Sequence, residues 1–143
     1  MKYTTEIKIN APIEKVAELI GDHNMMKNWM KELITHETVS GTPRKEGAKT
    51  KLRLNLGGGV DVLETLIKID FPNFFVTKYE LPQGSLTVVI TFEKDGKGTI
   101  YKLDHSFEFK GMLKIGTALM KPGFIKHSER MMQDFKKMVE KES

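Results

Sequence analysis

The chain contains no cysteine among its 143 residues. Without a thiol it can form no disulfide framework, no cysteine zinc site and no thiolate nucleophile. No apolar run approaches the roughly 18 residues that cross a membrane. The alternating N-terminus, MKYTTEIKIN, also lacks the apolar core of a signal peptide. We therefore expect a cytoplasmic protein with no stable insertion in a membrane.

The chain also has little excess of charge of either sign. Lysine and arginine number 23 against 19 acids, which leaves a net charge of only +4, and the lysines are scattered, often beside acids. A nucleic-acid surface needs basic residues gathered on one face with aromatic residues between them, so we expect no nucleic-acid partner. The histidines lack the spacing of metal ligands and no cofactor motif occurs, so we expect neither a metal nor a cofactor: His23, His36, His105 and His127.

The period of the hydrophobic residues changes along the chain. Residues 3–9 alternate between apolar and polar side chains, which predicts a half-buried strand. The next apolar residues recur at helical spacing and predict a short helix that ends at Gly21: Ile13, Val16, Ala17 and Ile20. Asp22 or Asn24 could cap a second short helix that presents Trp29.

About ninety residues then predict strands separated by turn signals at spacings of about ten residues, which is typical of an antiparallel meander. The expected strands are Leu33–Ser40, Ala48–Leu56, Val60–Asp70, Phe74–Leu81, Ser85–Glu93 and Thr99–Phe109.

From Gly123 to Lys141 the period becomes helical, and about 28 Å of helix at ~1.5 Å per residue can cross a whole sheet. Its inner stripe consists of Phe124, Ser128, Met131, Phe135 and Met138. Pro122-Gly123 should kink or break this helix from the preceding segment Met112–Lys121. A bent antiparallel sheet with one helix across its open face leaves a cavity that suits a small apolar molecule.

Four motifs follow one another in a familiar order: I-x-I-x-A-P-x-E-K-V-x-E-L-I at Ile7–Ile20, then Trp29, D-G-x-G-T at Asp95–Thr99, and F-K-x-M-V-E at Phe135–Glu140. Together they resemble the START-like superfamily, which includes polyketide cyclases, the birch-pollen allergen and lipid-transfer domains. The resemblance covers the whole chain. It implies an α+β helix-grip fold, in which a seven-stranded curved antiparallel sheet wraps around the long C-terminal helix and two short helices follow strand 1. Residues 1–143 would then form a single ligand-binding domain, and the resemblance implies binding of hydrophobic ligands in most members and catalysis in some.

The last strand carries the most distinctive polar candidate. Tyr101, Leu103, His105 and Phe107 share one face, and its apolar character predicts that it looks inward. His105 could orient a ligand carbonyl, act as a general acid or base, or be a hydrogen-bonded interior histidine. Ser128 could donate to a ligand or bond back to its own helix. The residues expected to contact a ligand are Trp29, Leu54, Tyr79, Tyr101, Leu103, His105, Phe107, Phe124, Ser128, Met131 and Phe135.

Glu64 lies on a strand whose two faces are both partly apolar. On the inner face it could pair with His105 as an acid/base unit. On the outer face it would be a surface acid, and we favour the surface. His127 lies at the border of the helix stripe and is expected to face solvent.

These features favour a binding protein for a small hydrophobic or amphipathic ligand, such as a lipid, an isoprenoid or a polyketide-like aromatic, oriented by His105, Tyr101 and Ser128. Its opening is expected between the two short helices, the Gly57–Gly59 turn and Pro122–Gly123. Two alternatives stay open. One is an enzyme of the cyclase, dehydratase or hydrolase type with His105 as acid/base. The other is a partner-binding module, as in superfamily members that act on ribosomes or help to position quinones.

Overall fold

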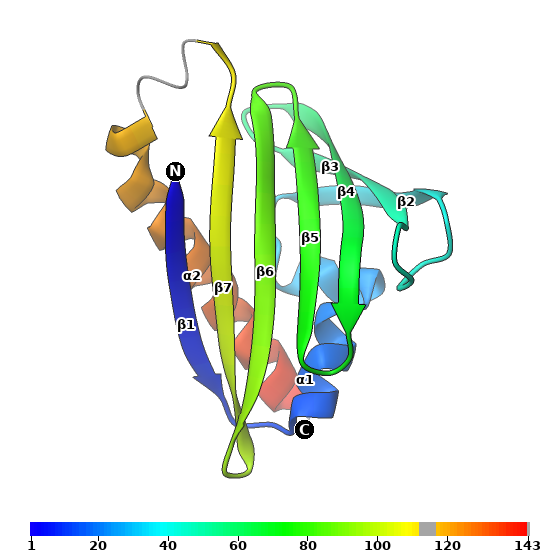
Figure 1. Ribbon diagram of the computed structural model, residues 1–143, viewed down its shortest axis with the longest axis vertical. Coiled ribbons are helices and arrows are strands. Elements are labelled where there is room, and N and C mark those ends of the chain that lie inside the picture. Colours follow the sequence, from blue (N-terminus) through cyan, green and yellow to red (C-terminus); the bar gives the residue numbers. More distant parts are fainter. Residues whose placement is uncertain (112–116, 143) are drawn as a thin grey trace.

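A computed structural model of the chain describes residues 1–111 and 117–142. One antiparallel sheet of seven strands curves around a long helix, which confirms the predicted α+β architecture (Figure 1). The strands are β1 (Lys2–Ile9), β2 (Leu33–Ser40), β3 (Lys49–Asn55), β4 (Gly59–Asp70), β5 (Phe74–Leu81), β6 (Gly84–Asp95) and β7 (Gly98–Phe109). The helices are α1 (Ile13–Ile20), the 3-10 helix η1 (His23–Asn28) and α2 (Thr117–Glu142).

The strand order in the sheet is β1-β7-β6-β5-β4-β3-β2, and all neighbours are antiparallel. Strands β2 to β7 therefore form a simple meander, and β1 joins it beside β7. Because β1 and β2 are the two edges of the sheet, α1 and η1 carry the chain from one edge to the other. In Figure 1, α2 lies behind β1, β7 and β6, and α1 lies near the lower end of the sheet.

The two short helices follow from local sequence signals. In α1 the residues at helical spacing are the buried ones: Ile13, Val16, Ala17 and Ile20. The side chain of Asp22, one of the two predicted caps, accepts a hydrogen bond from the backbone N–H of Asn24 at 2.9 Å at the start of η1. This turn directs the following residue, His23, toward the sheet rather than along α1.

Helix α2 continues through Pro122, so of the predicted kink or break at Pro122–Gly123 the break is wrong. The helix begins at Thr117, and Pro122 lies in its second turn. A proline there removes one backbone hydrogen bond near the end of a long helix, while the packing of the later turns supplies most of the stabilisation. Of the predicted preceding segment Met112–Lys121, residues 112–116 lie outside the described residues.

The two halves of α2 have different surroundings. Toward its C-terminus, Met132, Phe135, Met138 and Val139 are buried in the main core together with residues of α1 and η1. Toward its N-terminus the helix leaves space between itself and the sheet. Among the described residues, no helix is both long and apolar enough to span a membrane.

Candidate functional site

A cavity of about 610 Å³ lies between the inner face of the sheet and the N-terminal half of α2. We call it the apolar chamber, since aliphatic and aromatic side chains make up most of its wall. All but one of the residues expected to contact a ligand line it: Trp29, Leu54, Tyr79, Tyr101, Leu103, His105, Phe107, Phe124, Ser128 and Met131.

Phe135 is the exception, because it lines no part of this chamber. Its side chain is fully buried and packs edge-on against Trp29, at 5.9 Å between ring centroids, and against Tyr101, at 5.3 Å. The helical stripe therefore contains two kinds of residue. Phe124, Ser128 and Met131 line the chamber. Phe135 lies in the core, behind the lining residues Trp29 and Tyr101.

A short hydrogen-bonded series crosses the chamber wall between β1, α2 and β7. The Tyr3 hydroxyl lies 2.9 Å from Ser128 Oγ, which in turn lies 3.3 Å from Nε2 of His105. The Tyr3 ring also stacks on the His105 imidazole, with 4.3 Å between centroids. Ser128 thus bonds to neighbouring elements rather than to its own helix, and it fixes one ring nitrogen of His105.

The His105 imidazole is neutral at physiological pH. Burial lowers its pKa to about 4, against a smaller opposing effect of the Asp104 carboxylate. A neutral imidazole has one donor and one acceptor nitrogen, and Ser128 occupies Nε2. Nδ1 is buried and has no hydrogen-bond partner within the described structure. A polar ligand atom could supply that missing partner.

The outer end of the apolar chamber combines a hydrogen-bonded histidine–glutamate pair with exposed apolar side chains. His127 Nε2 lies 2.9 Å from Glu32 Oε1, and both residues line the chamber. The expectation that His127 faces solvent is only half right, since its side chain is 43% exposed but has this partner. Leu56 and Met120, also in the lining, are 47% and 37% exposed. This end is therefore the mouth of the chamber.

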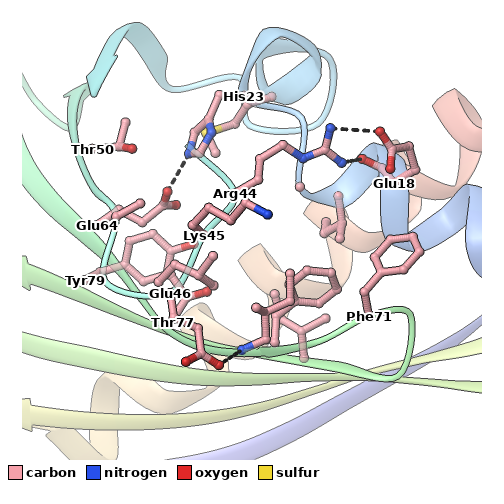
Figure 2. Close-up of a pocket in the computed structure, with 18 of the residues that line it drawn as sticks. Glu18, His23, Arg44, Lys45, Glu46, Thr50, Glu64, Phe71, Thr77 and Tyr79 are labelled. Atoms are coloured by element: carbon pink, nitrogen blue, oxygen red, sulfur yellow. Dashed lines mark hydrogen bonds and ion pairs between the residues drawn. The ribbon is translucent and has the colours of Figure 1, made fainter. Parts of the chain in front are cut away.

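A second cavity, of about 530 Å³, lies between α1, η1, the loop from β2 to β3, and strands β3 to β5. We call it the polar chamber. Figure 2 labels ten residues of its wall: Glu18, His23, Arg44, Lys45, Glu46, Thr50, Glu64, Phe71, Thr77 and Tyr79. Arg44 donates to Glu18 Oε1 at 2.8 Å and so ties the loop to α1 at one side of the chamber.

Glu64 faces this chamber, so our preference for a surface position was wrong. It is only 8% exposed and lies opposite Thr50 of β3 and Tyr79 of β5 in the register of the sheet. Its partner is His23 rather than His105: Nε2 of His23 lies 2.6 Å from Glu64 Oε1 (Figure 2). A buried carboxylate is tolerated here because the imidazole supplies a short charge-assisted hydrogen bond.

Glu64 changes the pKa values of the two ionisable groups beside it, His23 and Tyr79. The hydrogen bond to Glu64 raises the pKa of His23 above its usual value, and this effect outweighs the lowering due to burial. Burial, followed by the nearby charge of Glu64, raises the pKa of the Tyr79 hydroxyl well above its usual value. At neutral pH the tyrosine is therefore protonated, and the histidine holds a proton more readily than a free imidazole does.

The two chambers share a wall made of Ile20, Trp29, Tyr79 and Ile90. Trp29 is only 7% exposed, and its indole Nε1 has no hydrogen-bond partner among the described residues. A buried N–H without a partner costs free energy unless a water or ligand accepts from it. The boundary between the chambers therefore offers a hydrogen-bond donor.

His23 is the residue that the sequence analysis missed. A carboxylate in an otherwise apolar strand, at Glu64, was the available signal for a buried partner. Nothing local identified that partner, because 41 positions separate the two residues. In the described part of the chain, no three histidine, aspartate or glutamate side chains come together as metal ligands would.

Comparison with known proteins places the chain in a family. The sequence model described as "Polyketide cyclase / dehydrase and lipid transport" matches residues 1–140. This match and the fold confirm the predicted START-like relationship. No curated protein matches the sequence.

Solved structures of similar fold cover nearly the whole chain. TTHA0849 from Thermus thermophilus is 21% identical with a TM-score of 0.82, over 100% of this chain and 99% of that one. A START superfamily protein from Mycobacterium smegmatis is 13% identical with a TM-score of 0.77, over 99% of each chain. Ara h 8.0201 is 15% identical with a TM-score of 0.72, over 97% of each chain. At these identities the similarity establishes the helix-grip fold alone.

Proposed function

The chain belongs to the polyketide cyclase / dehydrase and lipid transport family, and from that premise we propose that it binds a small hydrophobic or amphipathic ligand in the apolar chamber. A lipid, an isoprenoid or a polyketide-like aromatic compound fits this description, and residues 1–143 act as one ligand-binding domain. The observation that carries the proposal is the apolar cavity of about 610 Å³ between the sheet and α2, with a mouth at one end. Such a volume is in the range of sites that enclose small molecules.

Burial of apolar ligand surface supplies the binding free energy. At about 25 cal/mol per Å², a ligand that buries roughly 250 Å² of apolar surface gains about 6 kcal/mol. The loss of translational and rotational freedom offsets part of this gain. Binding is therefore expected to tolerate variation in the apolar body of the ligand more readily than in its polar atoms.

Two buried polar atoms would orient the ligand. Nδ1 of His105 and Nε1 of Trp29 both lack protein partners within the described residues, and both residues line the apolar chamber. A ligand hydroxyl can pair with the imidazole nitrogen whichever tautomer it adopts, and a carbonyl oxygen can accept from the indole N–H. An amphipathic ligand with an oxygen function along its length matches these positions better than a pure hydrocarbon.

Binding accounts for His105 better than acid/base catalysis does. With a pKa of about 4, the imidazole is not protonated to the imidazolium that a general acid needs at neutral pH, and it is a weak base. The carboxylate that could have formed a pair with it, Glu64, bonds to His23 instead. We therefore assign His105 an orienting role.

Native mass spectrometry of the protein purified from its own host, followed by denaturing extraction, tests this proposal. We expect a co-purifying small molecule of defined mass. The variant Leu54→Trp, which fills part of the apolar chamber, should lose it. Ile67→Trp is the matched control, since this β4 side chain is 48% exposed and lines neither chamber.

Retention of the same molecule by Leu54→Trp would place its site elsewhere. An apo mass for the wild type, together with no binding of fatty acids, isoprenoid alcohols or polyphenols by tryptophan fluorescence, would contradict the proposal. A cytoplasmic location stays a prediction of the sequence that fractionation of host cells would test.

A further inference from the structure

The polar chamber contains a histidine–carboxylate pair that binding in the apolar chamber does not use. The side chains of His23 and Glu64 are 22% and 10% exposed, so the pair is shielded from bulk solvent but reachable from the chamber. The two residues come from η1 and β4. Their 2.6 Å bond crosses the wall of a cavity large enough for a small ring compound.

The pairing leaves one nitrogen of His23 available. Nε2 bonds to Glu64 Oε1, while Nδ1 has no hydrogen-bond partner among the residues that the structure describes. In a neutral imidazole the proton lies on the nitrogen that faces the carboxylate, because that nitrogen donates to it. The lone pair is then on Nδ1, so Glu64 selects the tautomer in which His23 is a base at its free nitrogen.

The groups around His23 strengthen its imidazole as a base. The hydrogen bond and charge of Glu64 and the charge of Asp22 raise the pKa of His23, while burial and the charge of Arg44 oppose the rise. The centroid of the His36 ring, on β2, lies 5.7 Å from the centroid of the His23 ring. A group that gains and loses its proton close to the working pH can serve as both base and acid.

The rest of the polar chamber suits a carbonyl compound. Phe71 and Phe75 provide apolar wall, and the buried Thr50 and Thr77 provide hydroxyl groups. Lys45 also lines the chamber and forms no ion pair with any residue in the described ranges (Figure 2). Its ammonium group can stabilise negative charge that develops on a substrate oxygen.

We propose that the polar chamber is a proton-transfer site for a small ketone or related carbonyl compound, with His23 as the catalytic base and Glu64 as its positioning residue. Nδ1 of neutral His23 takes a proton from the carbon next to the carbonyl. The electrons of that C–H bond form the C=C bond of an enolate, and the carbonyl π electrons move to oxygen. Return of a proton from the imidazolium to the same carbon restores the ketone. This site does not depend on the ligand proposed for the apolar chamber.

Exchange of hydrogen for deuterium tests this step without a known natural substrate. The probe is α-tetralone, a bicyclic aromatic ketone, incubated with the whole protein in D₂O and followed by mass spectrometry. We expect the wild type to accelerate exchange next to the carbonyl at least tenfold over the same concentration of free imidazole. His23→Gln, which keeps a polar side chain of similar reach, should return to the rate without protein.

A pH profile separates a positioning role of Glu64 from a merely structural one. The exchange rate of the wild type should rise with pH to a plateau, with a midpoint above 6.5. Glu64→Gln should lower the plateau about tenfold and move the midpoint downward, while its thermal unfolding shows that the variant remains folded. Asp61→Asn removes a carboxylate from the outer face of the same strand and should change neither.

No acceleration by the wild type, whether or not the ketone binds, would overturn the proposal. Acceleration that survives in His23→Gln would also overturn it. A plateau lost in Glu64→Gln without any shift of the midpoint would reduce the pair to a structural contact between η1 and β4. None of these results bears on ligand retention in the apolar chamber, so the two proposals can fail separately.

Discussion

At the scale of single residues, the surroundings of His23 and His105 shift the pKa values of the two histidines in opposite directions. His23 faces a carboxylate, and its pKa is raised. His105 faces a serine hydroxyl and the Tyr3 ring, and burial lowers its pKa to about 4. The same side chain thus serves as a titrating group in one chamber and as a neutral hydrogen-bonding group in the other.

The neutral state of His105 makes the protein less stable in acid. Between pH 6.5 and about 4 the unfolded chain binds a proton at this residue that the folded chain does not, so the free energy of unfolding falls as the pH falls. The wild type is expected to lose roughly 3 kcal/mol more stability than His105→Gln between pH 7 and pH 4. Urea unfolding at a series of pH values measures this difference.

Equal losses of unfolding free energy in the wild type and in His105→Gln would mean that the pKa of His105 is not lowered by folding.

His23 should show a pH dependence of stability of the opposite sign. Its raised pKa contributes stability that is present below pH 6.5 and is lost as the pH rises through the folded value. The stability difference between the wild type and His23→Gln should therefore shrink as the medium becomes alkaline.

At the scale of elements, α2 divides its length between stability and the site. Phe135 and Val139, nearer the C-terminus, are fully buried, whereas Phe124 and Met131, nearer the N-terminus, remain partly exposed beside the apolar chamber. A helix that filled the whole interior would leave no cavity. The buried residues near the C-terminus of α2 therefore hold the helix against the core, while the part nearer its N-terminus leaves space for a ligand.

Replacement of Phe135 by Ala should therefore cost about 3–5 kcal/mol of unfolding free energy, because it leaves a cavity among Trp29, Tyr101 and the rest of the core. Phe124→Ala is the matched control, since that ring is only partly buried and its loss enlarges an existing chamber. Guanidinium unfolding of both variants gives the comparison. A loss below about 1 kcal/mol in Phe135→Ala would contradict its place in the core.

The start of β6 requires a glycine. Gly84 has φ +154°, and a Cβ there would lie 2.0 Å from the carbonyl oxygen of Glu108 on β7. Gly84→Ala must separate these strands close to the apolar chamber, and we expect a loss of at least about 2 kcal/mol. Gly96→Ala in the hairpin after β6 meets no atom within 4 Å and should cost only about 1 kcal/mol. Similar thermal unfolding temperatures for the two variants would refute the steric argument.

At the scale of the molecule, the curvature of one sheet creates two cavities with different chemistry. α2 covers the side toward β1 and β7, while α1 and η1 cover the side toward β3, β4 and β5. A shared wall that includes Trp29 and Tyr79 separates them. A chain of 143 residues thus holds two adjoining cavities, one lined mostly by apolar side chains and one that also has charged side chains in its wall.

A ligand that fills the apolar chamber must stabilise the fold as a whole, because the unfolded chain has no such cavity. At a free concentration a hundred times its Kd, it should raise the free energy of unfolding by about 2.7 kcal/mol. Differential scanning calorimetry with a bound fatty acid would show the shift in the wild type and in Ile67→Trp, but not in Leu54→Trp. A shift of equal size in Leu54→Trp would mean that the ligand binds outside the chamber.

The sequence by itself determined the elements and the inward face of the last strand. Alternation and helical spacing are local properties, so they predicted β1 to β7, α1 and the inward orientation of Tyr101, Leu103 and His105. The ordered motifs identified the family, because they too are read along the chain. Ten residues that line the apolar chamber were therefore predicted from the sequence.

Only the tertiary structure decided which polar groups meet. Both faces of β4 are partly apolar, so its pattern could not orient Glu64; the register with β3 and β5 did. The partner of Glu64 lies on η1, and the volume of each chamber depends on how far the sheet curves around α2. Likewise, Phe135 and Phe124 share one helical stripe, yet only long-range packing placed one in the core and the other beside a cavity. Periodicity specifies which side of an element is buried, whereas contacts between elements decide what lies opposite it.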